Sequence, residues 1–105
     1  MEEETMSIAV TAKTFEQEVL HSDKPVLLDF WASWCGPCRM VGPVLEQIAQ
    51  ERSDVKVCKV NVDEEPELAS AFQIMSIPTL MVMRDGKMAS RSTGARPKNQ
   101  ILAML

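Results

Sequence analysis

Two stretches of the chain are apolar on both of the faces that an extended strand would present. Residues 26–31 carry a single charged side chain, Asp29, among apolar neighbours. Side chains of residues 55–62 would point alternately to two faces of a strand. Valines lie on one face, and Cys58 and further valines lie on the other. Strands that are apolar on both faces are typical of the centre of a covered sheet. We therefore expect two central strands, one of which holds an acid at a buried position.

Apolar residues at helical spacing predict four helices, at about residues 14–20, 37–52, 66–72 and 97–105. The first has a capping-box pattern, in which Thr14 caps the helix and Gln17 reaches back to it. Each of the other three has a proline at or near its start, where the missing N–H costs nothing. The remaining strand candidates are residues 7–10, 77–83 and 88–93.

The order of these elements is β-α-β-α-β-α-β-β-α. Strands that are connected through helices are expected to run parallel, with helices over both faces of the sheet. The last two strands flank Asp85 and Gly86, a strong signal for a tight antiparallel hairpin. The sequence therefore predicts one α/β domain over residues 1–105, in which residues 1–5 form a loose tail.

Charge and composition narrow the classes of partner. The formal net charge is −4 and no basic cluster is present, so we expect neither nucleic acid nor an anionic membrane as a partner. No apolar run approaches the length of a membrane span. The acidic N-terminus lacks the plan of a secretory signal, and three cysteines are an odd number for a disulfide framework. These features favour the cytoplasm, where thiols stay reduced. We also expect the chain to be a monomer.

Cys35 and Cys38 stand two residues apart, where a predicted strand is followed by a predicted helix. Thiols at this spacing in a first helical turn can close a disulfide with little backbone movement. The unpaired N–H groups and positive dipole end of the helix favour a thiolate, so we expect a lowered pKa for Cys35. Cys35 is then the candidate nucleophile, and the more enclosed Cys38 is the thiol that resolves a mixed disulfide.

Asp29 is the candidate base for Cys38. In an apolar strand, desolvation disfavours the carboxylate and raises its pKa, which suits a group that takes up a proton near neutral pH. Lys59, on a neighbouring predicted strand, would moderate that shift. The alternatives for Asp29 are a buried acid with satisfied hydrogen bonds and an exposed acid on an edge strand.

The cysteine pair also allows two other interpretations. A zinc site has the same Cys-x-x-Cys spacing, but it would need two more ligands. Cys58 and His21 are the remaining soft ligands and they have no ligand-like spacing, so we expect no metal. A purely structural disulfide conflicts with the expected reducing compartment. Cys58 is instead expected in the core and His21 in a solvated loop.

The ten residues from Asp29 to Cys38 resemble the active-site signature of the thioredoxin family. The resemblance continues in family order through Pro43, residues 59–63, residues 76–80, Asp85-Gly86 and Gly94. It implies the thioredoxin fold, a central five-stranded mixed sheet of order 1-3-2-4-5 flanked by four helices. It also implies a protein-disulfide reductase that maintains cell redox balance by reversible dithiol/disulfide exchange.

The resemblance also implies a role for individual residues. Cys35 matches the family nucleophile and Cys38 the resolving thiol of one redox disulfide, while Asp29 and Lys59 match the buried acid and its lysine neighbour. Pro78 matches a cis-proline that faces the dithiol. The groove for protein substrates would be formed by Trp34, Gly36, Pro37, Ile77, Pro78, Thr93, Gly94 and Ala95.

The partner implied by the resemblance is a thioredoxin reductase that contains flavin and uses NADPH. Both cofactors would belong to that partner, and this chain is expected to bind none, since it has no glycine-rich phosphate loop. Gln73 and Met75 depart from residues common in the family, so substrate preference is the property that they are expected to alter. Two rival functions are an oxidase or isomerase, against which Gly36-Pro37 argues, and a binding subunit or processivity factor whose dithiol is incidental.

Overall fold

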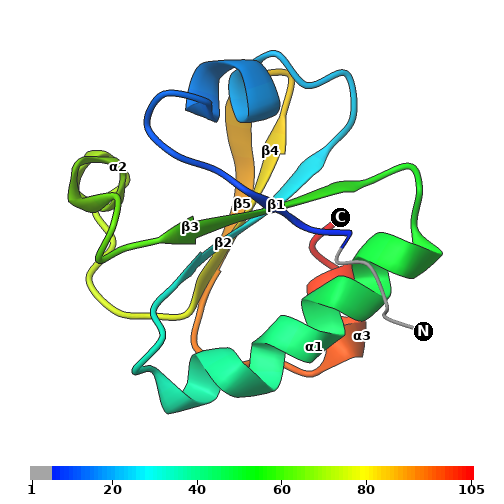
Figure 1. Cartoon of the computed structure of the whole chain (residues 1–105). Coiled ribbons are helices and arrows are strands. Elements are labelled where there is room, and N and C mark those ends of the chain that lie inside the picture. Colours follow the sequence, from blue (N-terminus) through cyan, green and yellow to red (C-terminus); the bar gives the residue numbers. More distant parts are fainter. Residues whose placement is uncertain (1–5) are drawn as a thin grey trace, which may run out of the picture.

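The computed structural model describes residues 6–105 and has a five-stranded sheet of order β1-β3-β2-β4-β5 at its centre (Figure 1). The strands are β1 (Ile8–Ala9), β2 (Val26–Trp31), β3 (Lys56–Asn61), β4 (Thr79–Arg84) and β5 (Lys87–Thr93). The strand order confirms the predicted fold class. The predicted tail at residues 1–5 lies outside the described residues.

Central position in the sheet explains the apolar character of β2. It pairs in parallel with β3 and antiparallel with β4, and five of its six residues are buried. The expectation of parallel pairing through every helical connection is wrong for β4. A helical connection permits parallel pairing but does not require it. Since β2 runs parallel to β3 and antiparallel to β4, the connection over residues 62–78 begins and ends at the same end of the sheet, and β4 returns in the opposite direction.

Four helical segments cover the two faces of the sheet: η1 (Glu16–Leu20), α1 (Gly36–Glu51), α2 (Pro66–Ala71) and α3 (Lys98–Leu102). Their positions confirm the four predicted helices, but η1 is a short π-helical segment without the predicted capping box. The Thr14 hydroxyl accepts a hydrogen bond from the N–H of Thr11 instead, at 3.0 Å. Within residues 6–105, no helix is long and apolar enough to cross a membrane.

The sheet separates two hydrophobic cores. One lies under η1 and α2 and includes Leu28, Phe30 and Phe72. The other lies under α1 and α3 and includes Leu27, Val57 and Ile101. Because side chains alternate along a strand, Asp29 shares the α1 face of the sheet with Leu27. The acid therefore lies on the face from which the cysteine-bearing helix packs.

The hairpin between β4 and β5 uses the predicted Asp85-Gly86 turn, with φ of +52° and +76° at these two residues. We expect Gly86→Ala to lower the free energy of unfolding by about 1–2 kcal/mol, because alanine resists this left-handed conformation. Its Cβ would also lie 3.3 Å from the carbonyl oxygen of Leu20. Urea unfolding measures the change.

Gly86→Asn is the matched control for this prediction. It adds the same Cβ, but asparagine adopts the left-handed conformation more readily than alanine. Its loss of stability should therefore be the smaller of the two. Equal midpoints of unfolding for Gly86→Ala and the wild type would contradict the assigned strain.

Candidate active site

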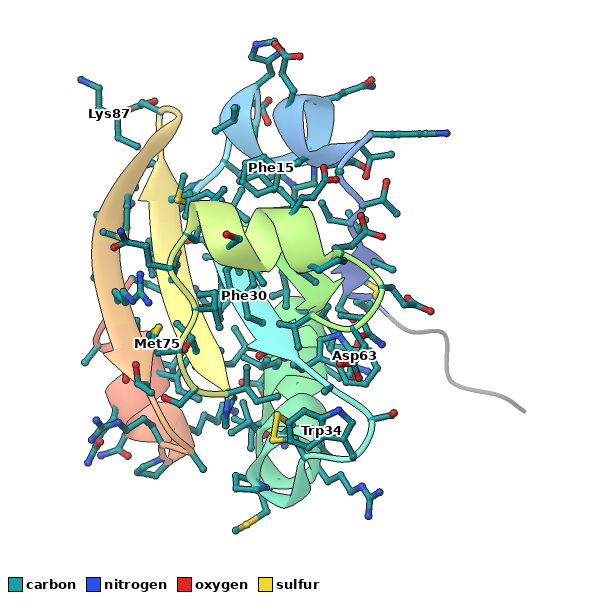
Figure 2. The ribbon with its side chains drawn as sticks, turned by 90° about the vertical axis from the view of Figure 1, so that its left-hand side faces the viewer. Phe15, Phe30, Trp34, Asp63, Met75 and Lys87 are labelled. Atoms are coloured by element: carbon teal, nitrogen blue, oxygen red, sulfur yellow. A yellow bond between two sulfur atoms is a disulfide. The ribbon has the colours of Figure 1, made fainter. Side chains whose placement is uncertain are left out.

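The thiol pair lies where β2 gives way to α1. Cys35 is the N-cap of α1 in an extended conformation, and its Sγ accepts a hydrogen bond from the N–H of Cys38 at 3.2 Å. The two cysteines form a disulfide with a Cα–Cα distance of 5.3 Å, inside the usual range of about 4.4–6.8 Å. Figure 2 shows this disulfide beside Trp34, at the end of the sheet opposite Lys87.

Both sulfur-bearing residues are enclosed. Cys35 is 4% exposed and Cys38 is 6% exposed, because Ala32, Val62 and Ile77 pack around them. The expected difference, with Cys38 the more enclosed residue, is therefore absent in the disulfide form. Gly36 and Pro37 lie exposed between the two cysteines. A partner can thus reach the pair over this turn.

Asp29 is buried as predicted, with 1% of its surface exposed. Burial raises the pKa of Asp29 from its ordinary value of 3.8 to about 7, and the positive charge of Lys59 opposes this shift. Oδ1 of Asp29 has no hydrogen-bond partner within the described part of the chain. Because β2 pairs on both sides, the alternative of an exposed acid on an edge strand is wrong.

Lys59 stands directly opposite Asp29 in the pairing of β2 and β3. Its Nζ lies over the indole ring of Trp31, 4.7 Å from the ring centroid. Lys59 also lines a cavity of about 360 Å³ whose wall includes Cys38, Arg39 and Pro43. Cys38 and the lysine that pairs with Asp29 therefore line the same cavity.

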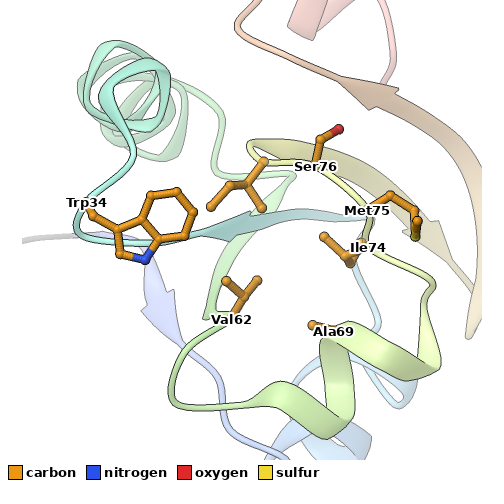
Figure 3. Close-up of a pocket in the computed structure, with 7 residues that line it drawn as sticks. Trp34, Val62, Ala69, Ile74, Met75 and Ser76 are labelled. Atoms are coloured by element: carbon orange, nitrogen blue, oxygen red, sulfur yellow. The ribbon is translucent and has the colours of Figure 1, made fainter.

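A second cavity is apolar, has a volume of about 390 Å³, and lies between Trp34 and the loop of residues 74–77 (Figure 3). Trp34 is 66% exposed and forms one side, where its Nε1 donates a hydrogen bond to Asp63 at 2.8 Å. The carbonyl oxygen of Ile77 lies 3.8 Å from Sγ of Cys35 and joins this cavity to the reactive sulfur. The full lining is Trp34, Val62, Ala69, Ile74, Met75, Ser76 and Ile77.

The model of the thioredoxin family matches residues 6–105. The chain belongs to the thioredoxin family. It is 57% identical over 98 residues to thioredoxin 1 of Synechococcus elongatus, an alignment that covers 92% of each chain. It is 52% identical over 104 residues to the thioredoxin of Mycobacterium tuberculosis, covering 98% of this chain and 90% of that one. The thioredoxin of Porphyra purpurea is 49% identical over 102 residues, which are 95% of each chain.

Family membership and the cysteine pair establish the activity. The chain is a thiol-disulfide oxidoreductase that reduces protein disulfides by dithiol/disulfide exchange. Thioredoxins have a reductase and disulfide-containing proteins as partners in general. Within residues 6–105, no group of three or more histidine, cysteine or acidic side chains is placed to hold a metal ion.

Two of the predicted groove residues, Trp34 and Ile77, line the apolar cavity. The Ile77–Pro78 peptide bond is cis, and the carbonyl oxygen of Pro78 accepts a hydrogen bond from the N–H of Gly94 at 2.8 Å. This bond places residues 93–95 beside Pro78, outside the lining of the cavity. Sequence patterns also did not single out Val62, Ala69 and Ile74 as groove residues, because apolar positions there fit the core equally well, and Ser76 stood in a predicted connector.

The remaining candidates lie away from this site. Cys58 is fully buried in the core under α2, and burial raises the pKa of its thiol to about 11. The prediction of a core role for Cys58 is therefore confirmed. His21 follows η1 and is exposed, as predicted for a solvated loop residue. Neither residue joins the dithiol in a metal site within the described chain.

Proposed function

We propose that Cys35 attacks the substrate disulfide and that Cys38 resolves the intermediate. The Cys35 thiolate forms a bond to one substrate sulfur and expels the other as a thiolate. Cys38 then loses its proton, attacks Sγ of Cys35, and releases the second substrate thiol while the Cys35–Cys38 disulfide forms. Substrate gains two electrons and this chain loses two. The observation that carries the proposal is the position of Cys35 as N-cap of a helix, disulfide-bonded to Cys38.

Helix geometry supports Cys35 as the attacking thiol. α1 has 16 residues, and the N–H of Cys38 already points at Sγ of Cys35. A thiolate there receives this hydrogen bond and the favourable end of the helix dipole, both of which stabilise negative charge. Cys38 lies one turn into the helix, so its sulfur does not occupy the N-cap position.

Asp29 supplies the proton acceptor in this proposal. A carboxyl group with a pKa of about 7 can take a proton from Cys38 and return it to solvent at neutral pH. Lys59 holds that pKa down, so the group does not remain protonated throughout the physiological range. Lys59 pairs with Asp29 across β2 and β3 and lines the same cavity as Cys38, which supports placing the acid near the second thiol.

We infer that a substrate docks an extended segment over Trp34, the Gly36-Pro37 turn, Ile77-Pro78 and residues 93–95. Trp34→Ala should lower kcat/KM for a protein disulfide about tenfold, because it removes the exposed side of the apolar cavity. Reduction of a small aromatic disulfide should change much less. Steady-state assays with both substrates measure the difference.

Two control variants separate the contributions of Trp34. Trp34→Phe keeps an aromatic ring but cannot donate the hydrogen bond to Asp63, so it isolates that bond. Met88→Ala removes another exposed apolar side chain, on β5, and should leave both rates unchanged. Wild-type kinetics for Trp34→Ala would exclude the docking role.

The proposed electron donor is a flavin-containing thioredoxin reductase that uses NADPH, and the proposed setting is the reducing cytoplasm, where this chain acts as a monomer. In an assay with NADPH, such a reductase and insulin, NADPH should be consumed continuously only when this chain is also present. A reduction potential below that of glutathione is expected, since the Gly36-Pro37 spacer has no histidine to favour the thiolate further. A potential as oxidising as that of glutathione would favour an oxidase or isomerase instead.

A further inference from the structure

Arg91, on the edge strand β5, holds the loop that forms one wall of the apolar cavity. Its Nη1 donates a hydrogen bond to the carbonyl oxygen of Phe72 at 2.7 Å. Its Nη2 donates to the carbonyl oxygen of Gln73 at 2.9 Å. The planar guanidinium thus donates hydrogen bonds to two successive carbonyl groups. A lysine ammonium cannot do so with the same fixed geometry.

Sheet register places Arg91 where it can make these bonds. It pairs with Met81 across the β4–β5 ladder, so the two side chains lie on one face of the sheet. Met81 belongs to the core cluster against which Phe72 packs, on the α2 face. The side chain of Arg91 therefore reaches from the sheet edge to the end of α2.

These two hydrogen bonds lie at the point where the chain leaves α2. Phe72 is the C-cap, and Gln73 adopts a positive φ of 53° to turn the chain away from the helix. Carbonyl groups in the last turn of a helix have no partner within it, so they need donors from elsewhere. The ring of Phe72 packs against Phe15 and Phe30, at centroid distances of 5.4 and 5.7 Å. The aromatic contacts fix the helix end, and Arg91 fixes the direction in which the loop departs.

That direction sets the shape of the substrate groove. The next four residues after Gln73 all line the cavity, among them Met75, which is 91% exposed. The last of the four is Ile77, whose carbonyl oxygen lies 3.8 Å from Sγ of Cys35. In Figure 3, Ile74, Met75 and Ser76 lie across the cavity from Trp34.

We propose that Arg91 is a positioning residue for protein substrates, one that holds the 73–77 wall of the groove at a fixed distance from Trp34 and the dithiol. This inference rests on the docking surface described under the proposed function. Arg91 itself is not part of the cavity lining, and its hydrogen bonds go to Phe72 and Gln73. Its removal should therefore affect the binding of a large partner and spare the chemistry at the disulfide.

The test compares Arg91→Gln and Arg91→Lys with Arg84→Gln. Arg84 is an exposed arginine on β4, in the hairpin at the opposite end of the sheet, and it makes no side-chain hydrogen bond within residues 6–105. For Arg91→Gln, KM for insulin should rise about fivefold with kcat nearly unchanged. Arg91→Lys should fall between this variant and the wild type, and Arg84→Gln should match the wild type. Reduction of a small aromatic disulfide should be equal in all four proteins.

Hydrogen exchange gives a second, local readout. The N–H groups of Gln73 and Ile74 bond to carbonyl groups of Ser70 and Ala69. Both amides should exchange faster in Arg91→Gln than in Arg84→Gln, while amides of β2 keep their rates. A general loss of stability would instead speed exchange in β2 as well and lower the rate with the small disulfide.

Three outcomes would overturn the proposal: an unchanged KM for insulin in Arg91→Gln, unchanged exchange at Gln73 and Ile74, or equal losses with large and small substrates. The proposed function fails in a different way. In that case wild-type protein would not reduce insulin, or Cys35→Ser would reduce it as well as the wild type does.

Discussion

Cys35→Ser is expected to abolish the reduction of protein disulfides, with a loss of about a thousandfold or more in rate. A serine hydroxyl at the N-cap keeps the hydrogen bond from the N–H of Cys38 but does not ionise near neutral pH. It also cannot form the mixed disulfide through which electrons leave the substrate. Insulin reduction with dithiothreitol as the electron source measures the loss. Activity equal to that of the wild type would exclude Cys35 as the nucleophile.

Cys38→Ser should have a different consequence, because it leaves the first step intact. The variant is expected to attack a substrate disulfide and then stop at the mixed disulfide, which mass spectrometry detects as an adduct on Cys35. The control is Cys58→Ala. Its thiol is buried in the core under α2, away from the dithiol, so turnover should persist and no adduct should accumulate. Adducts on Cys38 in the Cys35→Ser variant would reverse the assigned order of the two thiols.

Asp29→Asn is expected to slow the release of the mixed disulfide about tenfold or more between pH 6 and 8, without slowing its formation. Asparagine has nearly the same shape but accepts no proton, so Cys38 must lose its proton directly to solvent. The defect should shrink at higher pH, where Cys38 ionises unaided. Single-turnover kinetics across this range separate the two steps. A release rate that equals the wild type at every pH would refute the role of Asp29.

The same substitution should change how stability depends on pH. The pKa of Asp29 is 3.8 ordinarily and about 7 in the folded protein, so the folded state binds this proton more tightly. The contribution of Asp29 to stability is fully present below about pH 4 and is lost as pH rises through about 7. The loss is on the order of 4 kcal/mol, from a shift of about three pKa units.

Urea unfolding at several pH values tests this linkage. The wild type should lose stability between about pH 4 and pH 7 relative to Asp29→Asn, whose free energy of unfolding lacks this component. The difference in slope is the diagnostic quantity, because a buried asparagine amide has its own desolvation cost at every pH. Parallel curves for the two proteins would show that the folded state does not raise the pKa of Asp29.

Local sequence patterns predicted the parts of the fold that depend on neighbouring residues. β2 and β3 were recognisable because each is apolar on both faces. The hairpin followed from Asp85 and Gly86, which tolerate the positive φ that its turn requires. Local pattern was insufficient at Thr14, where the predicted capping box competes with a hydrogen bond that the hydroxyl accepts from the N–H of Thr11. A short polar side chain can satisfy either arrangement, so the residue type of Thr14 does not choose between them.

The candidate site divides in the same way. Cys35, Cys38 and Asp29 could be predicted because their chemistry is unusual for their places in the chain: thiols at a helix start and an acid in an apolar strand. The lining of the apolar cavity could not be predicted in this way. Val62 and Ala69 are ordinary apolar positions, and they line the cavity only because of the segments that face them. Arg91 carried no signal either, because its partners are backbone carbonyl groups 18 and 19 residues away.

The sequence alone thus determined the dithiol, its place at the start of a helix and the buried acid on the preceding strand, because each depends on residue type and short-range spacing. The tertiary structure alone decided the direction of β4, the similar enclosure of the two cysteines and the residues that line the apolar cavity. These properties depend on which distant segments meet. Which segments meet is fixed by the burial of both sheet faces, and no local pattern encodes it.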